Sequence, residues 1–405
     1  MKKHILFVDH APDAGAFYRR LFQTDAAAWQ VEVVATGLEA LEKLRTTACD
    51  VLVGRWRPAG KPVPEFFAAV AAAHPATARL IIAEALDREA VATLLGGSHQ
   101  YLQSPVEVNL LRSTIWRVCS IQNATLDQRL TSLLGADYTV PTLPSLYFRV
   151  LRALDSPEAS ILEVGEIIAQ DPAMVAKVLQ LANSAFFGLA RRIASPVEAV
   201  QILGIGKVRT LLLSIHAFSC FDASRMKSFP LSRLWNHSLA TSQIAQKICR
   251  LERAGKEFTE EAQLACMLHG VGKVILASGD PDRYQRAVAL ARQRGGAIVE
   301  AEREIFGASH AEVGAFLLSR WGMPIAVIEA IALHHAPSRS VIDHFSPLAV
   351  THVATCLETE KSAPVPGMEP TPLDRPYLER IGLLERLPLW REAVEEDERV
   401  AAGIC

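Results

Sequence analysis

Short apolar runs, separated by segments of helical spacing, most constrain what this chain can fold into. Five such runs occur in the first 105 residues, at Ile5–Val8, Val31–Ala35, Val51–Gly54, Leu80–Ala83 and Tyr101–Gln103. The segments between them are rich in Ala and Leu at helical intervals, as in Gly37–Leu44. Because short buried strands that alternate with helices form a parallel sheet covered on both faces, the pattern predicts a doubly wound (βα)5 domain.

The rest of the chain follows a different pattern. From Leu146 onward, strand-like alternation is hard to find, and helical periodicity dominates in segments such as Ile161–Ala169. Asp171 and Pro172 suit the N-cap and first position of a further helix, where the missing N–H of proline costs nothing. A length of 405 residues also exceeds one ordinary core. The expected fold class is therefore α/β plus all-α, with an α-helical bundle after the (βα)5 domain.

The composition is that of an ordinary soluble globular protein. The formal net charge is -2, with 50% hydrophobic and 21% charged residues, which leaves no positive excess to attract nucleic-acid phosphates. No uninterrupted apolar stretch is long enough to span a bilayer, and the first apolar run is stopped by Asp9 too early for a signal peptide. We therefore expect a cytoplasmic protein that binds neither nucleic acid nor membranes.

The cysteines give no sign of a metal knuckle or a redox pair. All seven are scattered along the chain, without a C-x-x-C pair. We expect them to be reduced thiols, buried in the protein interior.

Polar and charged residues fall where the predicted strands end. In open parallel sheets, the functional crevice lies at the carboxyl ends of the strands. The residues at those ends are Asp9 and His10 after the first run, Arg55 after the third, Ala83 at the end of the fourth and Ser104 after the fifth.

The first 120 residues resemble the receiver domain of two-component response regulators. The motifs that carry the resemblance are Ile5–Asp9, Asp50–Val53, Glu65–Phe67 and Tyr101–Pro105. In a receiver, two adjacent acids hold magnesium and a third carboxylate accepts the phosphoryl group, while a hydroxyl and a lysine read the product. The resemblance therefore implies a role in signal transduction.

Four positions of that chemistry are changed in this chain. A gap-free alignment from Asp50 through Glu65–Phe67 places Arg55 at the phosphoacceptor position. The neighbouring strands place His10 beside Asp9 in the acid pair, Ala83 at the hydroxyl position and Ser104 at the lysine position. A guanidinium group cannot act as a phosphoryl nucleophile. We therefore expect a pseudo-receiver that forms no aspartyl-phosphate. Arg55 either forms a structural ion pair with Asp9, which we favour, or mimics the activated state by placing a cation there.

A long amphipathic segment follows the (βα)5 domain. Apolar residues recur at mostly three- and four-residue intervals over Val106–Leu134, with no proline inside. This predicts that the last helix of the domain runs on into a linker helix at 121–137. Such a helix either pairs with a copy of itself or packs on its own domain, so a homodimer through the linker or the receiver-like domain stays open.

The second domain resembles the HDOD (HD-related output) family over Thr139–Leu357. The motifs, in the order of the family, are Gln170–Met174, Leu181–Gly188, Ile193–Val200 and Leu203–Arg209. The resemblance implies an HD-like helical domain at 138–357 with a general role in bacterial signalling. Gly204–Lys207 lacks the spacing of a phosphate-binding loop, so we expect a turn before a helix there.

The histidines of this domain have a spacing similar to that of HD-superfamily metal-dependent phosphohydrolases. The residues concerned are His237, His269, His310, His334, His335 and His352. In that chemistry, imidazoles and carboxylates hold one or two divalent metal ions, and a bridging aspartate helps to make hydroxide available.

Two carboxylates of the hydrolytic pattern are replaced. Gly270 stands at the aspartate of the histidine-aspartate pair, and Thr355 stands at the late aspartate. Without them, a metal pair loses its bridge and its charge compensation, so we expect no catalysis. His237, His269, His310, His334 and His335 could still hold one zinc, iron or manganese ion. The alternative, which we favour, is that several are buried, hydrogen-bonded helix residues. No other cofactor is expected.

The last segment, 358–405, is expected to be an extension of the bundle. Ser362–Pro372 is rich in proline and is predicted to be a loop. Tyr377–Leu384 and Leu389–Val400 regain helical spacing.

The predicted function is non-enzymatic. We expect a response-regulator-like protein that relays signals through contacts with signalling proteins, whose identity the sequence does not give. One alternative is an HD-type phosphohydrolase acting on a nucleotide or cyclic dinucleotide, which the surviving histidines favour and Gly270 and Thr355 oppose. A DNA-binding regulator is a third, but no basic recognition helix is evident.

Overall fold

The chain forms two compact units, one built mainly on residues 1–130 and the other mainly on residues 131–405. The computed structural model describes residues 2–23, 29–56, 77–83, 100–106, 160–170, 195–219, 229–321, 323–361 and 372–401, with scattered positions between them. Within this part of the chain, no helix is both long enough and apolar enough to cross a membrane.

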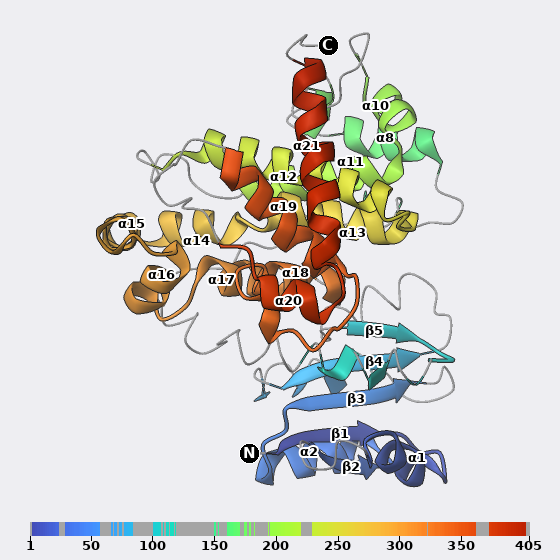
Figure 1. The fold of residues 1–405 in the computed structure, drawn as a ribbon. Helices are drawn as coiled ribbons and strands as arrows, with labels where there is room; N and C mark the ends of the chain where they lie inside the picture. The colour runs from blue at the N-terminus through green and yellow to red at the C-terminus, as the bar shows by residue number, and fades with distance from the viewer. Residues whose placement is uncertain are drawn as a thin grey trace. The chain divides into compact units, whose positions relative to one another are not determined.

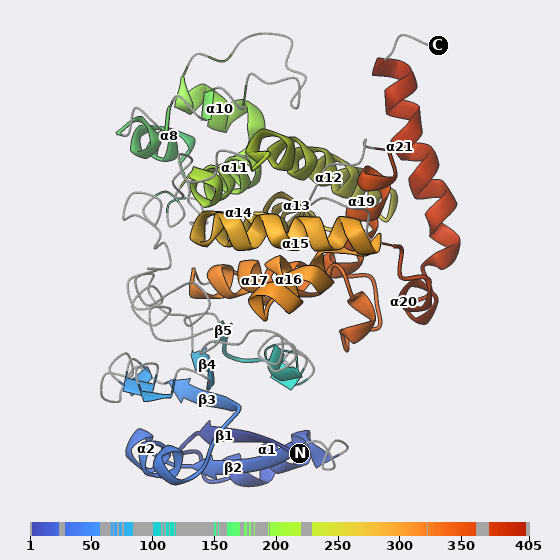
Figure 2. The same ribbon diagram turned by 90° about the vertical axis from the view of Figure 1, so that its left-hand side faces the viewer.

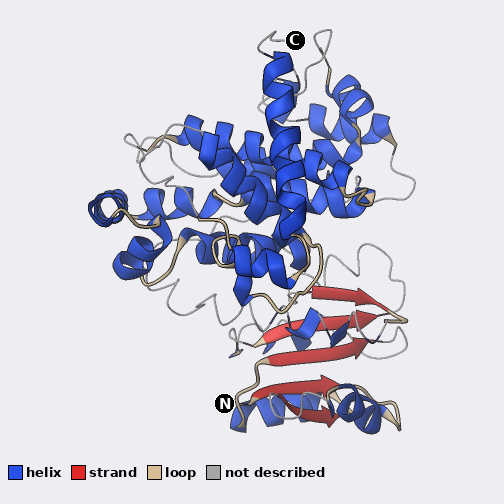
Figure 3. Ribbon diagram, viewed as in Figure 1, coloured by secondary structure: helices blue, strands red, loops and turns tan. Residues whose placement is uncertain are grey.

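The first unit contains a five-stranded parallel sheet (Figure 1; red in Figure 3). Its strands are β1 (Lys3–Val8), β2 (Trp29–Val34), β3 (Val51–Trp56), β4 (Ala78–Ala83) and β5 (Gln100–Gln103). The strand order is β2-β1-β3-β4-β5, and all neighbouring strands run parallel. This is the doubly wound order 2-1-3-4-5 of receiver-type folds, so the predicted fold class of this domain is confirmed.

Alternation along β1 divides its side chains between two cores, one on each face of the sheet. Ile5 and Phe7 pack with Tyr18 of α1 (Ala14–Leu21) on one face. Leu6 packs with Leu44 of α2 (Gly37–Thr46) on the other. Because successive side chains of a strand point to opposite faces, a fully apolar strand needs cover on both.

The long segment after β5 is described only in part. Leu111, Ile115 and Val118 are buried in the same core as Ile5 and Phe7, at helical intervals. This spacing agrees with the predicted last helix of the domain. The predicted linker at 121–137 lies outside the described residues.

The described part of the second unit is helical (blue in Figure 3). Its earlier helices are α8 (Ile161–Ala169), α10 (Pro196–Leu203), α11 (Ile205–Ser219), α12 (Leu231–Leu251), α13 (Lys256–Leu268) and α14 (Val271–Gly279). They are followed by α15 (Pro281–Arg294), α16 (Ile298–Phe306), α17 (His310–Arg320), α18 (Ile325–Leu333), η3 (Pro337–Arg339), α19 (Pro347–Lys361), α20 (Arg375–Arg380), η4 (Leu384–Arg386) and α21 (Leu387–Ala401). The predicted all-α class of this unit is confirmed.

Local signals in the sequence account for several helix boundaries. Ser195 caps α10, because its hydroxyl accepts the backbone N–H of Glu198 at 3.1 Å, and Pro196 occupies the first turn. Gly204 has a φ of +82° and separates α10 from α11. The turn predicted at Gly204–Lys207 is thus confined to Gly204, whose positive φ favours glycine, because α11 already begins at Ile205.

The central helices of this unit pack around α12, which contacts α13, α19 and α21 (Figures 1 and 2). Trp390 of α21 is buried, and its indole N–H donates to Glu252 Oε1 at 2.8 Å. Arg386 also contacts Glu252. The final helix thus packs on the bundle, as the periodicity of the tail predicts. Of the predicted loop Ser362–Pro372, all but Pro372 lies outside the described residues.

Four cysteines are described, and all are free and buried. They are Cys49, Cys249, Cys266 and Cys356. For these four, the prediction of buried reduced thiols is confirmed.

Candidate functional site

Asp9 and Arg55 meet at the carboxyl end of the sheet. Asp9 directly follows β1 and is buried, and Arg55 is the last but one residue of β3. Arg55 Nη1 lies 3.5 Å from Asp9 Oδ2. The position aligned with the phosphoacceptor thus carries a cation that pairs with the remaining acid of the pocket.

Both carboxylate oxygens of Asp9 have further partners. The Tyr18 hydroxyl donates to Oδ2 at 3.0 Å, and the backbone N–H of Ala11 donates to Oδ1 at 3.0 Å. Burial raises the pKa of Tyr18, and Asp9 raises it further, so the hydroxyl keeps its proton and remains a donor. The Tyr18 ring also stacks on Phe7, with 3.8 Å between centroids. Asp9 is therefore held as a structural member of the domain.

The other predicted pocket residues lie at the same edge. Ala83 is buried at the end of β4, and Ser104 directly follows β5 and is half-buried. His10 is exposed. The methyl group of Ala83 cannot form the hydrogen bond that a hydroxyl makes in a receiver. The five residues therefore share one end of the sheet, where Asp9 and Arg55 are paired with each other.

The second site is a cluster of histidines in the helical unit. The five predicted residues are brought together from four places: His237 within α12, His269 at the end of α13, His310 at the start of α17, and His334 and His335 after α18. Ring centroids are 5.0 Å apart for His237 and His269, 5.2 Å for His269 and His334, 4.0 Å for His334 and His335, and 4.9 Å for His310 and His335.

Backbone carbonyls fix the orientation of two of these rings. His269 Nδ1 lies 2.7 Å from the carbonyl oxygen of Cys266, and His334 Nδ1 lies 2.8 Å from that of Ile331. A carbonyl can only accept, so Nδ1 carries the hydrogen in both rings. Burial lowers the pKa of both histidines well below the usual range, which keeps them neutral. In each ring, Nε2 therefore carries no hydrogen and offers a lone pair.

Two glutamates hold two further rings, and the sequence analysis missed both. Oε2 of Glu302, in α16, lies 2.6 Å from His310 Nδ1 and accepts the backbone N–H of His310 at 2.8 Å. Oε2 of Glu358, in α19, contacts His237 Nδ1. Both carboxylates are buried. Acids from two other helices thus contact rings of the cluster on the Nδ1 side, at positions other than the two replaced carboxylates.

A signal for both glutamates exists in the sequence. Glu302 lies four residues from both Ile298 and Phe306, on a stripe that is otherwise apolar. Glu358 lies one helical turn after Thr355, the position where an aspartate was expected. An acidic residue on a buried face of a helix indicates a specific partner, because burying an unpaired charge costs about 5 kcal/mol.

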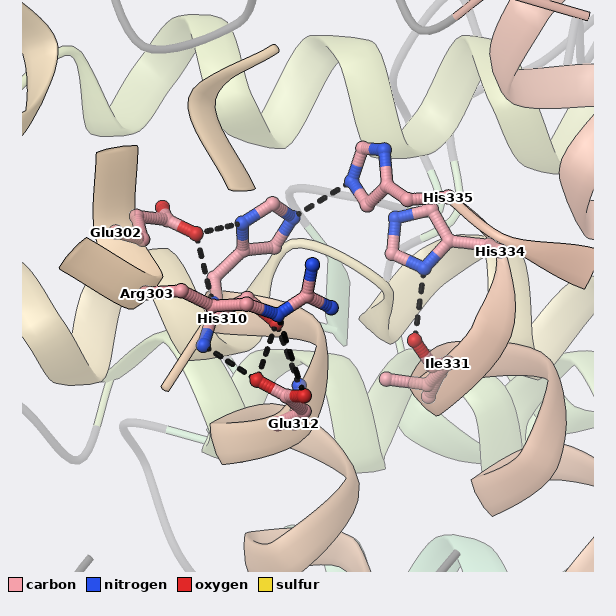
Figure 4. A network of polar contacts seen from close by, with 8 residues as sticks. Glu302, Arg303, His310, Glu312, Ile331, His334 and His335 are labelled. Atoms are coloured by element: carbon pink, nitrogen blue, oxygen red, sulfur yellow. Dashed lines mark hydrogen bonds and ion pairs between the residues drawn. The ribbon is translucent and has the colours of Figure 1, made fainter. Parts of the chain in front are cut away.

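The Nε2 atoms of the cluster face one another. His237 Nε2 and His269 Nε2 are 3.0 Å apart, and so are His310 Nε2 and His335 Nε2. His334 Nε2 is buried without a hydrogen-bond partner among the described residues. Figure 4 shows Glu302, His310 and His335 joined in a row, with His334 beside them.

The geometry fits a divalent metal ion. One ring nitrogen from each of His310, His334 and His335 lies within 4.8 Å of the others. Metal-binding histidines usually donate their second ring N–H to a carboxylate or a backbone carbonyl, as His310 and His334 do here. Neutral imidazole suits zinc, iron and manganese. These three histidines are therefore the best candidates for metal ligands in the described part of the chain.

The positions of the two missing aspartates are filled by other groups. A Cβ added at Gly270 would lie 2.6 Å from Cδ1 of Leu234, so an apolar side chain borders this position. The Thr355 hydroxyl donates to the carbonyl oxygen of Thr351 at 2.8 Å, within its own helix. Neither position supplies an oxygen that bridges the cluster.

His352 lies outside the cluster and supports it. Its Nδ1 lies 2.7 Å from the carbonyl oxygen of His334, and its Nε2 accepts the backbone N–H of Asp374 at 2.9 Å. Both nitrogens are therefore used, which leaves none for a metal ion. The role of His352 is to hold the backbone of His334.

The HDOD family model matches residues 140–337. A solved HDOD domain protein of unknown function from Geobacter sulfurreducens is 26% identical, with a TM-score of 0.55, over 68% of this chain and 94% of that one. A putative phosphohydrolase from Shewanella amazonensis SB2B is 21% identical, with a TM-score of 0.51, over 66% of this chain and 93% of that one. The second likeness shows a shared fold.

Curated relatives match shorter stretches. An uncharacterized protein of Treponema pallidum (strain Nichols) is 28% identical over 196 residues, which is 48% of this chain and 37% of that protein. Ribonuclease Y of Thermus thermophilus is 38% identical over 102 residues, which is 25% of this chain and 16% of that protein. The chain thus spans well under half the length of these relatives. Residues 140–337 of the chain thus match the HDOD family, and they follow an α/β domain with the strand order of receiver-type folds.

Proposed function

We propose that this chain is a bacterial signal-transduction protein that acts through contacts with partner proteins and catalyses no hydrolysis. The observation that carries the proposal is the apolar neighbour of Gly270: a Cβ added there would meet Cδ1 of Leu234 at 2.6 Å. An HD-type hydrolase needs a carboxylate there to bridge metal ions and to help form hydroxide. Here the space is apolar, and the hydroxyl of Thr355 is used within its helix.

The receiver-like domain supports the same proposal. Asp9 is engaged by Arg55, Tyr18 and Ala11, so neither of its oxygens is left without a partner. Magnesium-dependent phosphoryl transfer requires free carboxylate oxygens at this edge. The domain is then a rigid module for docking rather than a phosphorylation switch.

We further propose that the histidine cluster holds a single zinc, iron or manganese ion in a structural role. His310, His334 and His335 would be its ligands, and the buried Nε2 of His334 supports this because it has no partner among the described residues. A bound ion would join the start of α17 to the residues after α18. It would stabilise the folded domain, because the unfolded chain has no such site.

Metal analysis followed by a hydrolysis screen tests this proposal. Full-length protein would be loaded with zinc, iron or manganese and assayed with nucleotides and cyclic dinucleotides, alongside His269→Ala and His344→Ala. His344 is an exposed histidine that lies outside the cluster, so its variant is the matched control. We expect no metal-dependent turnover in any protein. Turnover lost in His269→Ala and kept in His344→Ala would contradict the non-enzymatic role.

The alternative function is that of a metal-dependent phosphohydrolase. It is favoured by the two carboxylates, Glu302 and Glu358, that contact cluster histidines. The names of two similar proteins, the Shewanella phosphohydrolase and ribonuclease Y, point in the same direction. Against it, both carboxylates contact Nδ1, on the side of each ring away from the Nε2 atoms. The hydrolysis screen separates the two functions.

A further inference from the structure

One of the two oxygens of the buried Glu302 carboxylate has no hydrogen-bond partner among the described residues. Oε2 of Glu302 contacts Nδ1 of His310, whereas Oε1 is the buried oxygen without a partner. A buried acid with an unused oxygen is costly, and an amide or apolar side chain would avoid that cost. A positive charge close to Glu302, such as that of a bound metal ion, would offset this cost.

The position of Glu302 also fixes the ring of His310. Oε2 accepts both the backbone N–H and the Nδ1 hydrogen of His310, at 2.8 and 2.6 Å, which ties the ring to the first residue of α17. An acid at a helix N-terminus is stabilised by the exposed N–H groups there. With Nδ1 held in this way, Nε2 of His310 is directed at His335, 3.0 Å away.

Glu358 has the same relation to His237. Its Oε2 contacts Nδ1, while Nε2 of His237 faces Nε2 of His269 at 3.0 Å. The two acids come from different helices, α16 and α19, and each contacts the outer side of a ring in the cluster. They contribute negative charge one imidazole away from its centre.

We propose that Glu302 and Glu358 are positioning residues for the metal site: they hold His310 and His237 with Nε2 directed inward and supply the negative charge lost at Gly270 and Thr355. The inference rests on the metal-holding role proposed above. It follows from charge balance, because a divalent ion bound only by neutral imidazoles would be an uncompensated charge in a buried site. Two carboxylates, each in contact with a ring of the cluster, offset that charge.

Titration of the metal-free, full-length protein with Co²⁺ tests the inference. Binding would be followed by the visible absorption of Co²⁺, whose bands report the ligand geometry, in the wild type, Glu302→Gln and Glu358→Gln. Glutamine keeps the shape and the accepting oxygen but removes the charge. We expect Co²⁺ affinity to fall about 10- to 100-fold in Glu302→Gln, as for other groups that orient metal ligands. The fall should be smaller in Glu358→Gln, because His237 is not one of the three proposed ligands.

Glu312→Gln is the matched control. Glu312 is a buried acid in the first turn of the same helix as His310, but it contacts Ser309 and Arg303 rather than a histidine (Figure 4). Thermal unfolding of the metal-free proteins would measure the structural cost of each change. We expect Glu312→Gln to lower the unfolding temperature and to leave Co²⁺ affinity and the visible bands unchanged.

The outcomes separate this inference from the proposed metal site. If the wild type binds Co²⁺ and both glutamine variants bind equally well, the positioning role is wrong and the metal site stands. An equal loss of affinity in Glu312→Gln would also overturn the positioning role, because the effect would then come from folding. If the wild type binds neither Co²⁺ nor Zn²⁺, both proposals fail. Should Glu302→Gln not fold, the smaller loss of affinity expected in Glu358→Gln, measured against Glu312→Gln, decides.

Discussion

At the scale of single residues, Gly270 and Gly272 of the helical unit differ in the atoms that surround them. Gly270 replaces an expected acid and leaves room for Leu234. Gly272 is required by packing, because a Cβ there would lie 1.9 Å from the carbonyl oxygen of His310. The close approach of α14 to the start of α17 is thus part of what places His310 in the cluster.

The first prediction concerns this approach. Gly272→Ala should lower the free energy of unfolding by about 3 kcal/mol, because backbone on both sides has to move to admit a methyl group. Urea denaturation measures the change. Gly255→Ala is the control, since a Cβ at Gly255 meets nothing within 4 Å. It should cost at most about 1 kcal/mol, as a less favourable N-cap. Equal losses in the two variants would contradict the packing argument.

Arg55 gives a second prediction at this scale. Full-length protein treated with acetyl phosphate and Mg²⁺ should gain no phosphoryl group, because a guanidinium stands at the acceptor position and Asp9 is engaged by three partners. Intact mass measurement checks this, with an ordinary receiver domain treated in parallel as the positive control. Stable aspartyl-phosphate on this chain would mean that Arg55 is not at the acceptor position.

At the scale of elements, α21 packs on the bundle through described side chains such as Trp390. Trp390 is almost completely buried, at 1% exposure, and donates to Glu252 at the end of α12. The neighbouring Leu389 is 37% exposed. An amphipathic helix at a chain end depends on such anchors, because short helices are marginal by themselves.

The third prediction tests this anchor. Trp390→Ala should lower the free energy of unfolding by about 3–5 kcal/mol, through loss of apolar burial and of the bond to Glu252. Leu389→Ala, on the exposed side of the same helix, should cost less than about 1 kcal/mol. Limited proteolysis would show whether α21 is released before the rest of the bundle unfolds. Similar effects of the two substitutions would rule out Trp390 as the anchor.

At the scale of the whole molecule, two folds with altered sites share one chain. In the sheet, Arg55 stands where an acceptor acid was expected, and it pairs with Asp9. In the bundle, two expected metal-bridging acids are Gly270 and Thr355, while Glu302 and Glu358 contact histidines from the other side. Both sites therefore differ from the expected pattern in their carboxylates, and this difference is the basis of the proposed non-enzymatic role.

Much of the architecture was predictable from the sequence because it depends on local periodicity. The five apolar runs became β1 to β5, and Ile161–Ala169 became α8 with the expected bounds. Strand and helix periods are properties of neighbouring residues, so a single sequence contains them. The motifs also predicted which five histidines lie together.

Only the tertiary structure decided what surrounds those histidines. Glu302 precedes His310 by eight residues, and Glu358 is 121 residues from His237, yet both contact the rings at Nδ1. The filling of the space beside Gly270 by Leu234 is likewise a contact between helices. Such contacts depend on how helices pack, which residue spacing does not specify. The sequence alone therefore determined the fold and the members of the cluster, whereas packing decided its charge and orientation.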